Sequence, residues 1–265
     1  MRMPALFVTH GGGPMPLLTN DKGHAPLTKW LKGAAKSLVP HKPDAIVCVT
    51  AHWETATPML STNPSPPMLY DYSGFPPESY EYKYPAAGPP KELTARVTQL
   101  LGDAGLSPRV DARRGFDHGT FVPLMLMYPG ADIPVLQISI LSGSDAKAHI
   151  KLGEALAPLR NEGVLIVCSG SSFHNMRGFS GGHEAEAQAF DKWLGDVCVK
   201  ETGKMRAKSL AAWASAPGGR ACHPVGGEEH LMPLLVAAGA GGDGAGRVAH
   251  QFKMFSVPVS SFVFE

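Results

Sequence analysis

Four histidines in this chain lie next to apolar runs, and they are the residues whose type and spacing best suit chemistry. His10, His52 and His174 each follow a short apolar run, and His230 immediately precedes one. Short runs rich in β-branched residues are typical of buried parallel strands. Ligands bind at the carboxyl ends of such strands in an open α/β sheet, and neutral imidazole binds divalent transition metals. The pattern therefore predicts a metal site.

The segments that must position these histidines alternate between expected strands and expected helices. Strands are expected at Ala5–Thr9, Ala45–Thr50, Pro108–Asp111, Val135–Ile140 and Val164–Cys168, with one or two closing strands between residues 248 and 264. Helices are expected at Leu27–Leu38, Lys91–Ala104, Ala146–Asn161, His183–Val199, Met205–Ala214 and Glu228–Ala240, with a short one ending at Met127. This alternation predicts an α/β fold: a single domain, residues 1–265, with a mostly parallel central sheet flanked by helices and the metal site at the strand carboxyl ends.

A proline-rich stretch from Pro58 to Pro90 carries a series of aromatic side chains between Tyr70 and Tyr84. This aromatic content is too high for a disordered linker. We therefore expect an ordered loop that lies against the body of the protein and covers the crevice.

Length, charge and cysteine content narrow the class of protein. The chain has 265 residues and a formal net charge of +1, which gives no reason to expect a nucleic-acid or membrane partner. The longest apolar run is far below the roughly 18 residues that span a bilayer. We find no signal peptide and no Cys-x-x-Cys motif, so we expect reduced cysteines and a cytoplasmic protein, as a monomer or small homo-oligomer.

The turn before His174 suggests an alternative chemistry. It reads Ser169-Gly-Ser-Ser172, and a serine hydrolase would use Ser171 or Ser172 as its nucleophile with His174 as the base. The turn does not match the Gly-x-Ser-x-Gly motif, and no aspartate is placed to complete a triad. A metal-dependent role is therefore favoured.

Two acid–histidine pairs leave alternatives open. Adjacent residues on a helix diverge by about 100°, so only one of Glu229 and His230 is expected to bind a metal. The other either hydrogen-bonds to a ligand or caps the helix. In the second pair, Asp117 and His118 either form a turn closed by the aspartate or place the histidine beside a substrate as a proton donor.

In this order the histidine motifs resemble the LigB-type class III extradiol ring-cleavage dioxygenases, especially the branch that includes 4,5-DOPA extradiol dioxygenase. The resemblance covers nearly the whole chain. The motifs that carry it are Pro4-Ala-Leu-Phe-Val-Thr-His-Gly11, Ala51-His-Trp-Glu54, Tyr82-Lys-Tyr-Pro-Ala-Ala-Gly-Pro89, Phe116-Asp-His-Gly-Thr-Phe-Val-Pro-Leu124, Tyr128-Pro-Gly-Ala-Asp-Ile-Pro-Val135, His223-Pro224 and Glu229-His-Leu-Met-Pro-Leu234. The spacing between the last two motifs is longer than usual in that branch, so the choice between Glu229 and His230 stays open.

The resemblance implies a non-haem Fe(II) site that opens the ring of a catechol (DOPA-like) substrate with O2, with Zn(II) as an alternative occupant in the isolated protein. His10, His52 and His230 match the family's metal ligands. His174 matches an acid/base histidine that also contacts the metal, and His118 matches a histidine that lines the substrate pocket.

Thr120 and Pro14, in the motifs around His118 and His10, are expected to line the same substrate pocket. Two other functions fit a retained metal site. One is a catalytically inactive relative that binds a protein or peptide or serves redox signalling, and the other is a zinc-dependent hydrolase. The two additional histidines, His118 and His174, favour the dioxygenase, because a pure binding module does not need them.

Overall fold

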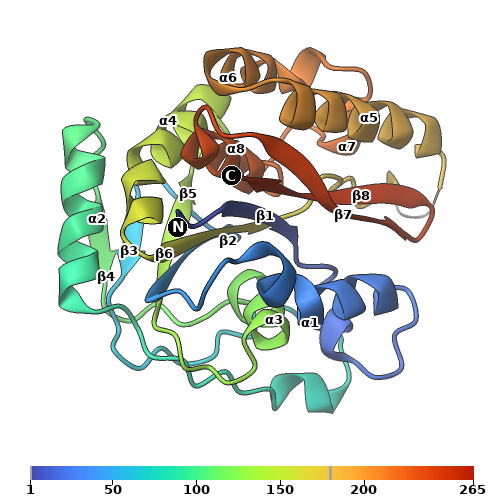
Figure 1. The fold of residues 1–265 in the computed structure, drawn as a ribbon. Helices are drawn as coiled ribbons and strands as arrows, with labels where there is room; N and C mark the ends of the chain where they lie inside the picture. Colours follow the sequence, from blue (N-terminus) through green and yellow to red (C-terminus); the bar gives the residue numbers. More distant parts are fainter. Residues whose placement is uncertain (1, 179–180) are drawn as a thin grey trace.

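The computed structural model describes residues 2–178 and 181–265, which form one sheet of eight strands flanked by helices (Figure 1). The strands lie in the order β4-β3-β5-β2-β6-β1-β8-β7. Their bounds are β1 Ala5–Thr9, β2 Ala45–Thr55, β3 Met59–Ser61, β4 Arg109–Asp111, β5 Val135–Leu141, β6 Val164–Gly170, β7 Gly246–Met254 and β8 Val257–Phe264. The predicted α/β class is confirmed.

The four central strands, β5-β2-β6-β1, run parallel to one another. Every residue of β1, β5 and β6 is buried, as expected for parallel strands covered on both faces. Antiparallel pairing occurs only towards the edges, where β8 joins β1 and β7 and where β3 joins β5. The carboxyl ends of the central strands therefore share one edge of the sheet.

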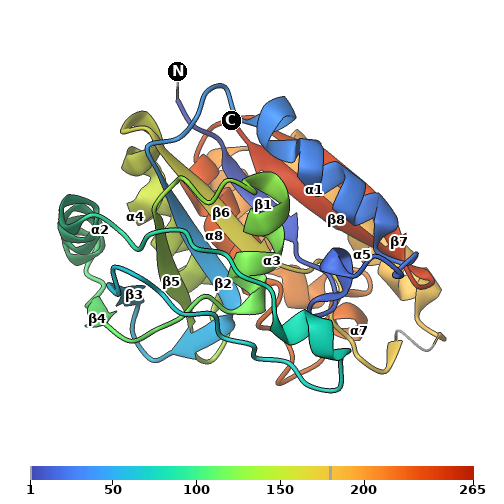
Figure 2. The same ribbon diagram turned by 90° about the horizontal axis from the view of Figure 1, so that it is seen from below.

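Helices cover both faces of this sheet. Helices α1 and α3 lie on one face, and α4, α8 and α5 lie on the other (Figures 1 and 2). The helix bounds are α1 Ala25–Leu38, α2 Lys91–Asp103, α3 His118–Met127, α4 Ala146–Leu156, α5 Glu184–Lys200, α6 Gly203–Ala211, α7 Gly219–Cys222 and α8 Met232–Gly241, with short 3-10 segments at Met15–Leu17, Pro77–Tyr80, Ala157–Asn161 and Trp213–Ser215.

Helices α4 and α8 pack at very close range through glycine. A Cβ atom at Gly153 in α4 would lie 2.0 Å from the Val236 carbonyl oxygen, and a Cβ atom at Gly239 in α8 would lie 2.2 Å from the Ile150 carbonyl oxygen. All residues of α8 are buried. The pair therefore forms a tight layer under β6 and β1, which fixes the position of the loop that precedes α8.

Buried Arg160 ties the first strand to the last. Its guanidinium donates to the carbonyl oxygens of Met3 (2.6 Å), Ala240 (2.8 Å) and Phe264 (3.1 Å). The same ends are joined by the antiparallel pairing of β1 with β8. Strand β1 is therefore held between β6 and β8.

Several expected elements differ in their bounds: the helices expected at Leu27–Leu38, Ala146–Asn161 and Met205–Ala214, for example, span Ala25–Leu38, Ala146–Leu156 and Gly203–Ala211. Three further differences concern segments near the predicted site. The helix expected at Glu228–Ala240 begins at Met232, because Pro233 suits the first turn of a helix. Strand β2 continues past Thr50 to Thr55 through an irregularity in its pairing with β5. The predicted ordered loop after Pro58 contains the short strand β3 in addition.

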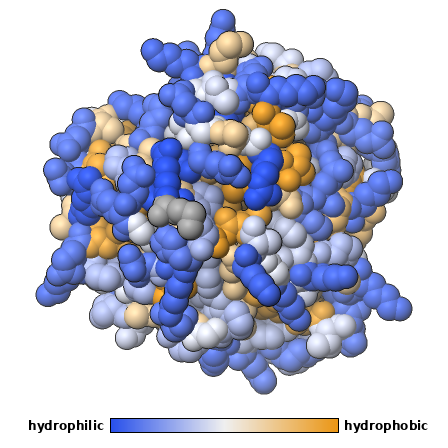
Figure 3. Space-filling model, in the orientation of Figure 1, coloured by the Kyte–Doolittle hydropathy of each residue, from blue (hydrophilic) through white to orange (hydrophobic). Residues whose placement is uncertain are grey.

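The surface seen in Figure 3 is mostly hydrophilic, with apolar side chains in small separated patches. Among the described residues, no helix combines the length and apolar character that crossing a bilayer requires.

Candidate metal centre and active site

Three neighbouring strands deliver histidines to one edge of the sheet. His10 follows β1, and His174 lies four residues after the end of β6. His52 lies in the irregular part of β2, where the pairing with β5 shifts between Thr50 and Glu54. Such an irregularity re-aims side chains at the end of a strand. Because β2, β6 and β1 are adjacent, these histidines, each singled out in the sequence, meet at one edge of the sheet.

His230 reaches the same group of histidines from the loop before α8. The backbone N–H of Ser171 donates to the His230 carbonyl oxygen over 2.9 Å, which fastens this loop to the end of β6. A Cβ atom at Gly170 would lie 2.2 Å from that same oxygen. The small residue at the end of β6 therefore permits the close approach that brings His230 into the site.

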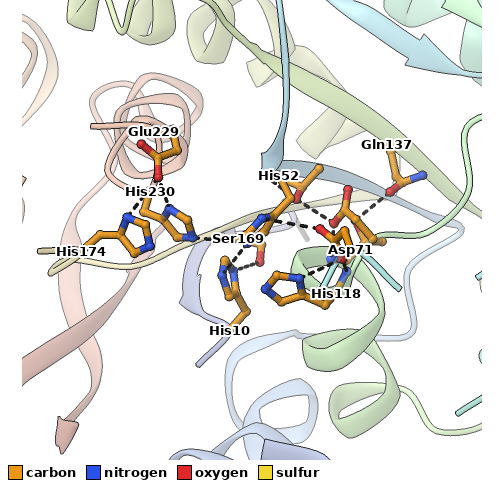
Figure 4. A network of polar contacts seen from close by, with 12 residues as sticks. His10, His52, Asp71, His118, Gln137, Ser169, His174, Glu229 and His230 are labelled. Carbon is orange, nitrogen blue, oxygen red and sulfur yellow. Dashed lines mark hydrogen bonds and ion pairs between the residues drawn. The ribbon is translucent and has the colours of Figure 1, made fainter. Parts of the chain in front are cut away.

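The Nε2 atoms of His10, His52 and His230 converge on one point (Figure 4). His52 Nε2 lies 3.1 Å from His10 Nε2 and 3.2 Å from His230 Nε2. The Nδ1 atoms face away from this point: that of His10 is 2.8 Å from Ser169 Oγ, and that of His230 is 2.8 Å from Glu229 Oε1. These outer partners favour a proton on Nδ1 and leave Nε2 lone pairs facing one another.

These three histidines fit a bound metal ion. Burial, followed by the other histidines, lowers the pKa of His10 well below its usual value, and the same two causes lower the pKa of His52 to about 4. The rings are therefore neutral and able to coordinate. Metal–nitrogen distances of about 2.0–2.1 Å imply nitrogens roughly 3–3.4 Å apart, which matches the spacing observed. A cation at this point would relieve the mutual repulsion of the lone pairs.

His174 lies beside this group and not within it. Its ring stacks on that of His230, with centroids 3.4 Å apart. The Glu229 carboxylate lies 3.0 Å from His174 Nδ1, an ion-pair contact that is not aligned as a hydrogen bond, and also accepts from His230 Nδ1. Burial raises the pKa of Glu229, but its contacts with both histidines outweigh this and lower that pKa below its usual value. Glu229 is thus the partner of two histidines.

His118 lies on the opposite side of the three-histidine group from His174, at the start of α3 (Figure 4). Its ring centroid lies 3.8 Å from that of His52 and 5.2 Å from that of His10. Asp117 caps α3 by accepting from the Thr120 backbone N–H, so the expected aspartate turn forms while His118 lies beside His52 and His10. A Cβ atom at Gly119 would lie 3.0 Å from the His52 ring, so glycine permits this contact.

Asp71, which the sequence analysis did not single out, is the acidic partner of His118. Its Oδ1 accepts from His118 Nδ1 over 2.9 Å and from the His118 backbone N–H over 3.0 Å. Its Oδ2 lies 3.6 Å from His52 Nδ1. Burial raises the pKa of Asp71, but the bonds from His118 and the proximity of His52 lower it to about 2. A carboxylate between two aromatic residues in a proline-rich loop is the only sequence signal for this role.

The two other expected pocket residues lie farther back. Thr120 is fully buried, and its hydroxyl donates to Gln137 Oε1 over 2.8 Å, so this hydroxyl serves the packing behind His118. Pro14 is buried at the start of the 3-10 turn that follows the His10 motif. Neither placement favours a direct polar contact with a substrate.

The loop that carries the aromatic residues between Tyr70 and Tyr84, called the aromatic loop below, packs against the glycine turn that follows His10. A Cβ atom at Gly13 would lie 3.0 Å from the Phe75 ring, and Tyr72 lies edge-on to His118 with centroids 5.8 Å apart. The loop is therefore ordered against the body of the protein, as the sequence predicts, and it lies beside His118.

Comparison with known proteins agrees with this site. Residues 4–265 match the family described as the catalytic LigB subunit of aromatic ring-opening dioxygenase. The chain belongs to this family, and its class is that of an extradiol ring-cleavage dioxygenase.

Two curated relatives and one solved structure illustrate the similarity. A 4,5-DOPA dioxygenase extradiol of Beta vulgaris is 42% identical over 245 residues, with 89% of this chain and 86% of the relative covered. Dioxygenase tasH of Hapsidospora irregularis is 40% identical over 253 residues, covering 89% and 78%. A crystal structure of an uncharacterized protein from Escherichia coli K12 aligns over 100% of both chains, with 31% identity and a TM-score of 0.78.

Proposed function

We propose that this enzyme opens the ring of a catechol of the DOPA type by extradiol cleavage with O2, and that it requires Fe(II). The observation that carries the proposal is the convergence of three imidazole Nε2 atoms, flanked by two further histidines that each bear a carboxylate partner. The names of the relatives support the substrate class.

The proposed metal ligands are His10, His52 and His230. Between Glu229 and His230, the geometry supports His230, because Glu229 lies behind the Nδ1 atom of that ring. A bound Fe(II) would supply Lewis acidity and redox chemistry for the reaction of the catechol with O2. Zn(II) suits the same nitrogen ligands and is the expected occupant of protein isolated without iron.

His174 and His118 handle protons in this proposal. His174 lies against the ligand His230 and accepts a proton from a substrate hydroxyl, while Glu229 at its Nδ1 stabilises the imidazolium that results. His118, fixed by Asp71 on the other side, donates a hydrogen bond to or accepts one from the bound ring through its remaining nitrogen. The aromatic loop beside His118 limits the access of water.

We further propose that the protein acts in the cytoplasm as a monomer or small homo-oligomer. The four cysteines are free and buried, which agrees with a reducing compartment. Analytical ultracentrifugation of the purified protein tests the oligomeric state.

The deciding experiment is anaerobic loading of the protein with Fe(II), followed by air and a panel of catechols that includes DOPA. We expect a yellow ring-opened product, which disappears when a chelator is added. Stoichiometric metal binding without product from any catechol would contradict the proposal and favour a relative that retains the site for another use. Hydrolysis of esters by the Zn(II) form would favour the zinc-dependent hydrolase.

A further inference from the structure

The site contains two carboxylates in matching positions. Glu229 contacts the expected ligand His230 and the pocket residue His174, and Asp71 contacts the expected ligand His52 and the pocket residue His118 (Figure 4). Each carboxylate therefore joins one ring of the three-histidine group to one ring outside it. Ion pairs of Asp71 in the described part of the chain involve these histidines alone, with no lysine or arginine.

We propose that Asp71 is a positioning residue that selects the ring nitrogen which His118 and His52 each present to the centre of the site. The catalytic consequence of this role rests on the proposed function, whereas its structural basis does not. Asp71 Oδ1 takes both the side-chain and the backbone N–H of His118, so the ring is held in one orientation with its proton on Nδ1. Nε2 is then the nitrogen available to a substrate.

The second carboxylate oxygen acts on His52. Asp71 Oδ2 lies 3.6 Å from His52 Nδ1, and His52 Nε2 points at the other ligand nitrogens. A negative charge at this distance favours a proton on Nδ1, which leaves the Nε2 lone pair for a metal. One side chain thus sets the donor atom of a ligand and the free nitrogen of its neighbour.

Backbone and side-chain hydrogen bonds fix the conformation of the loop around Asp71. The Asp71 backbone N–H donates to the Leu69 carbonyl oxygen, and Leu69 N–H donates to the Phe116 carbonyl oxygen, two residues before His118. On either side, the Tyr70 hydroxyl donates to the Tyr82 carbonyl oxygen (2.7 Å) and the Tyr72 hydroxyl donates to the Ser79 carbonyl oxygen (2.6 Å). The loop is therefore fastened to itself and to the segment that carries His118.

The test measures ring tautomers directly, by 15N NMR of histidine-labelled, Zn(II)-loaded protein. In the unchanged protein we expect His118 to carry its proton on Nδ1. In Asp71→Ala we expect this signal to be replaced by that of the Nε2–H form or of a mixture. A proton on Nε2 in the unchanged protein, or an unaltered Nδ1–H signal in Asp71→Ala, would overturn the proposal.

Asp71→Asn separates the effect of Asp71 on His118 from its effect on His52. The amide oxygen can still accept from His118, but the amide N–H2 then faces His52 Nδ1–H and repels it. We expect the His118 tautomer to persist while Zn(II) affinity, measured by chelator competition, falls about 10-fold or more. Unchanged affinity would overturn the assignment of His52. Glu81→Gln, an exposed carboxylate change on the same loop, is the control and is expected to alter neither property.

Kinetics of the Fe(II) form complete the test. In Asp71→Ala we expect kcat to fall about 10–100-fold while KM changes less, since the change affects residues that act on the reacting atoms. If the unchanged protein opens no catechol but the NMR and affinity results hold, the proposed function fails and the positioning role stands. If ring opening occurs but the His118 tautomer is the same in Asp71→Ala as in the unchanged protein, the positioning role fails and the proposed function stands.

Discussion

At the scale of single side chains, Glu229 gives a clear prediction because it contacts two histidines of the site. It touches the Nδ1 atoms of His230 and His174, so its removal disturbs an expected metal ligand and an expected acid/base at once. For Glu229→Gln we expect metal affinity to fall about 10–100-fold and kcat to fall with it. Chelator competition and steady-state kinetics measure the two effects.

The control for this change is its neighbour. Glu228 accepts from Arg220 Nη1 in α7 and from the Gly226 backbone N–H in the loop that follows α7, and neither contact involves a histidine. Glu228→Gln is therefore expected to leave metal affinity nearly unchanged. Equal losses in both variants would mean that the loop as a whole, and not the Glu229 carboxylate, supports the site.

The histidines divide into two groups with distinct mutant behaviour. His10→Ala and His52→Ala each remove one of three converging nitrogens, and we expect metal content after dialysis to drop in both. His174→Ala removes a ring that stacks outside this group, so we expect it to keep its metal and lose most ring-opening activity. Elemental analysis decides: full occupancy in His10→Ala, or an empty site in His174→Ala, would reverse the assignment.

The sequence alone predicts most of the site, because histidines that follow strands share one edge of a parallel sheet. The sequence does not show which of Glu229 and His230 is the metal ligand, because that choice depends on whether both residues lie in a helix. In the structure both residues precede α8, and the Glu229 carboxylate contacts Nδ1 of His230, on the side of the ring away from His52. Asp71 escapes notice because its role depends on how an aperiodic loop folds back over 47 residues to His118.

At the scale of elements, the contact between α4 and α8 allows a stability prediction. Gly239→Ala places a methyl group near the Ile150 carbonyl oxygen, a contact that the two helices can relieve only by moving apart. We expect a loss of about 1–3 kcal/mol in the free energy of unfolding, even though alanine is the better helix former. Urea denaturation measures the loss.

Gly33 in α1 provides the matched control. It also lies within a helix, but a Cβ atom there would meet no atom within 4 Å. Gly33→Ala is expected to stabilise the protein by about 0.5–1 kcal/mol. A stabilising effect at both positions would mean that α4 and α8 have room to separate.

The strand and helix pattern is predictable because apolar periodicity reports burial, and the buried runs of β1, β5 and β6 are clear in the sequence. The irregularity in β2 is not predictable in this way. Residues 51–55 are not uniformly apolar, and only the pairing with β5 shows that the strand resumes after His52.

At the scale of the whole molecule, buried neutral histidines make the metal-free protein sensitive to acid. Burial lowers the pKa of His223 to about 4, from a usual value of 6.5, and that of His52 also to about 4. The unfolded chain therefore binds more protons than the folded one between these values. The stability that these two groups contribute is fully present above pH 6.5 and is lost as the pH falls towards 4.

His223 isolates one contribution to this effect. Its Nε2 lies 3.0 Å from the Ser172 carbonyl oxygen, a bond that the amide of His223→Gln can replace. A shift of this size in one group corresponds to on the order of 3 kcal/mol. We expect the free energy of unfolding of the variant to depend less steeply on pH between 6.5 and 4, and parallel pH profiles of the two proteins would contradict this.

The position of β1 between β6 and β8 has a consequence for the order of events during synthesis. The first of the eight strands pairs along one of its two edges with the last of the eight, Val257–Phe264, and Arg160 donates to the carbonyl oxygens of Met3 and Phe264 at the same place. Because β1 pairs with β8, we expect His10, which follows β1, to reach its final position only after β8 has left the ribosome. We therefore expect metal capture by a complete site to follow the synthesis of β8, so that a nascent chain stalled before β8 retains little metal.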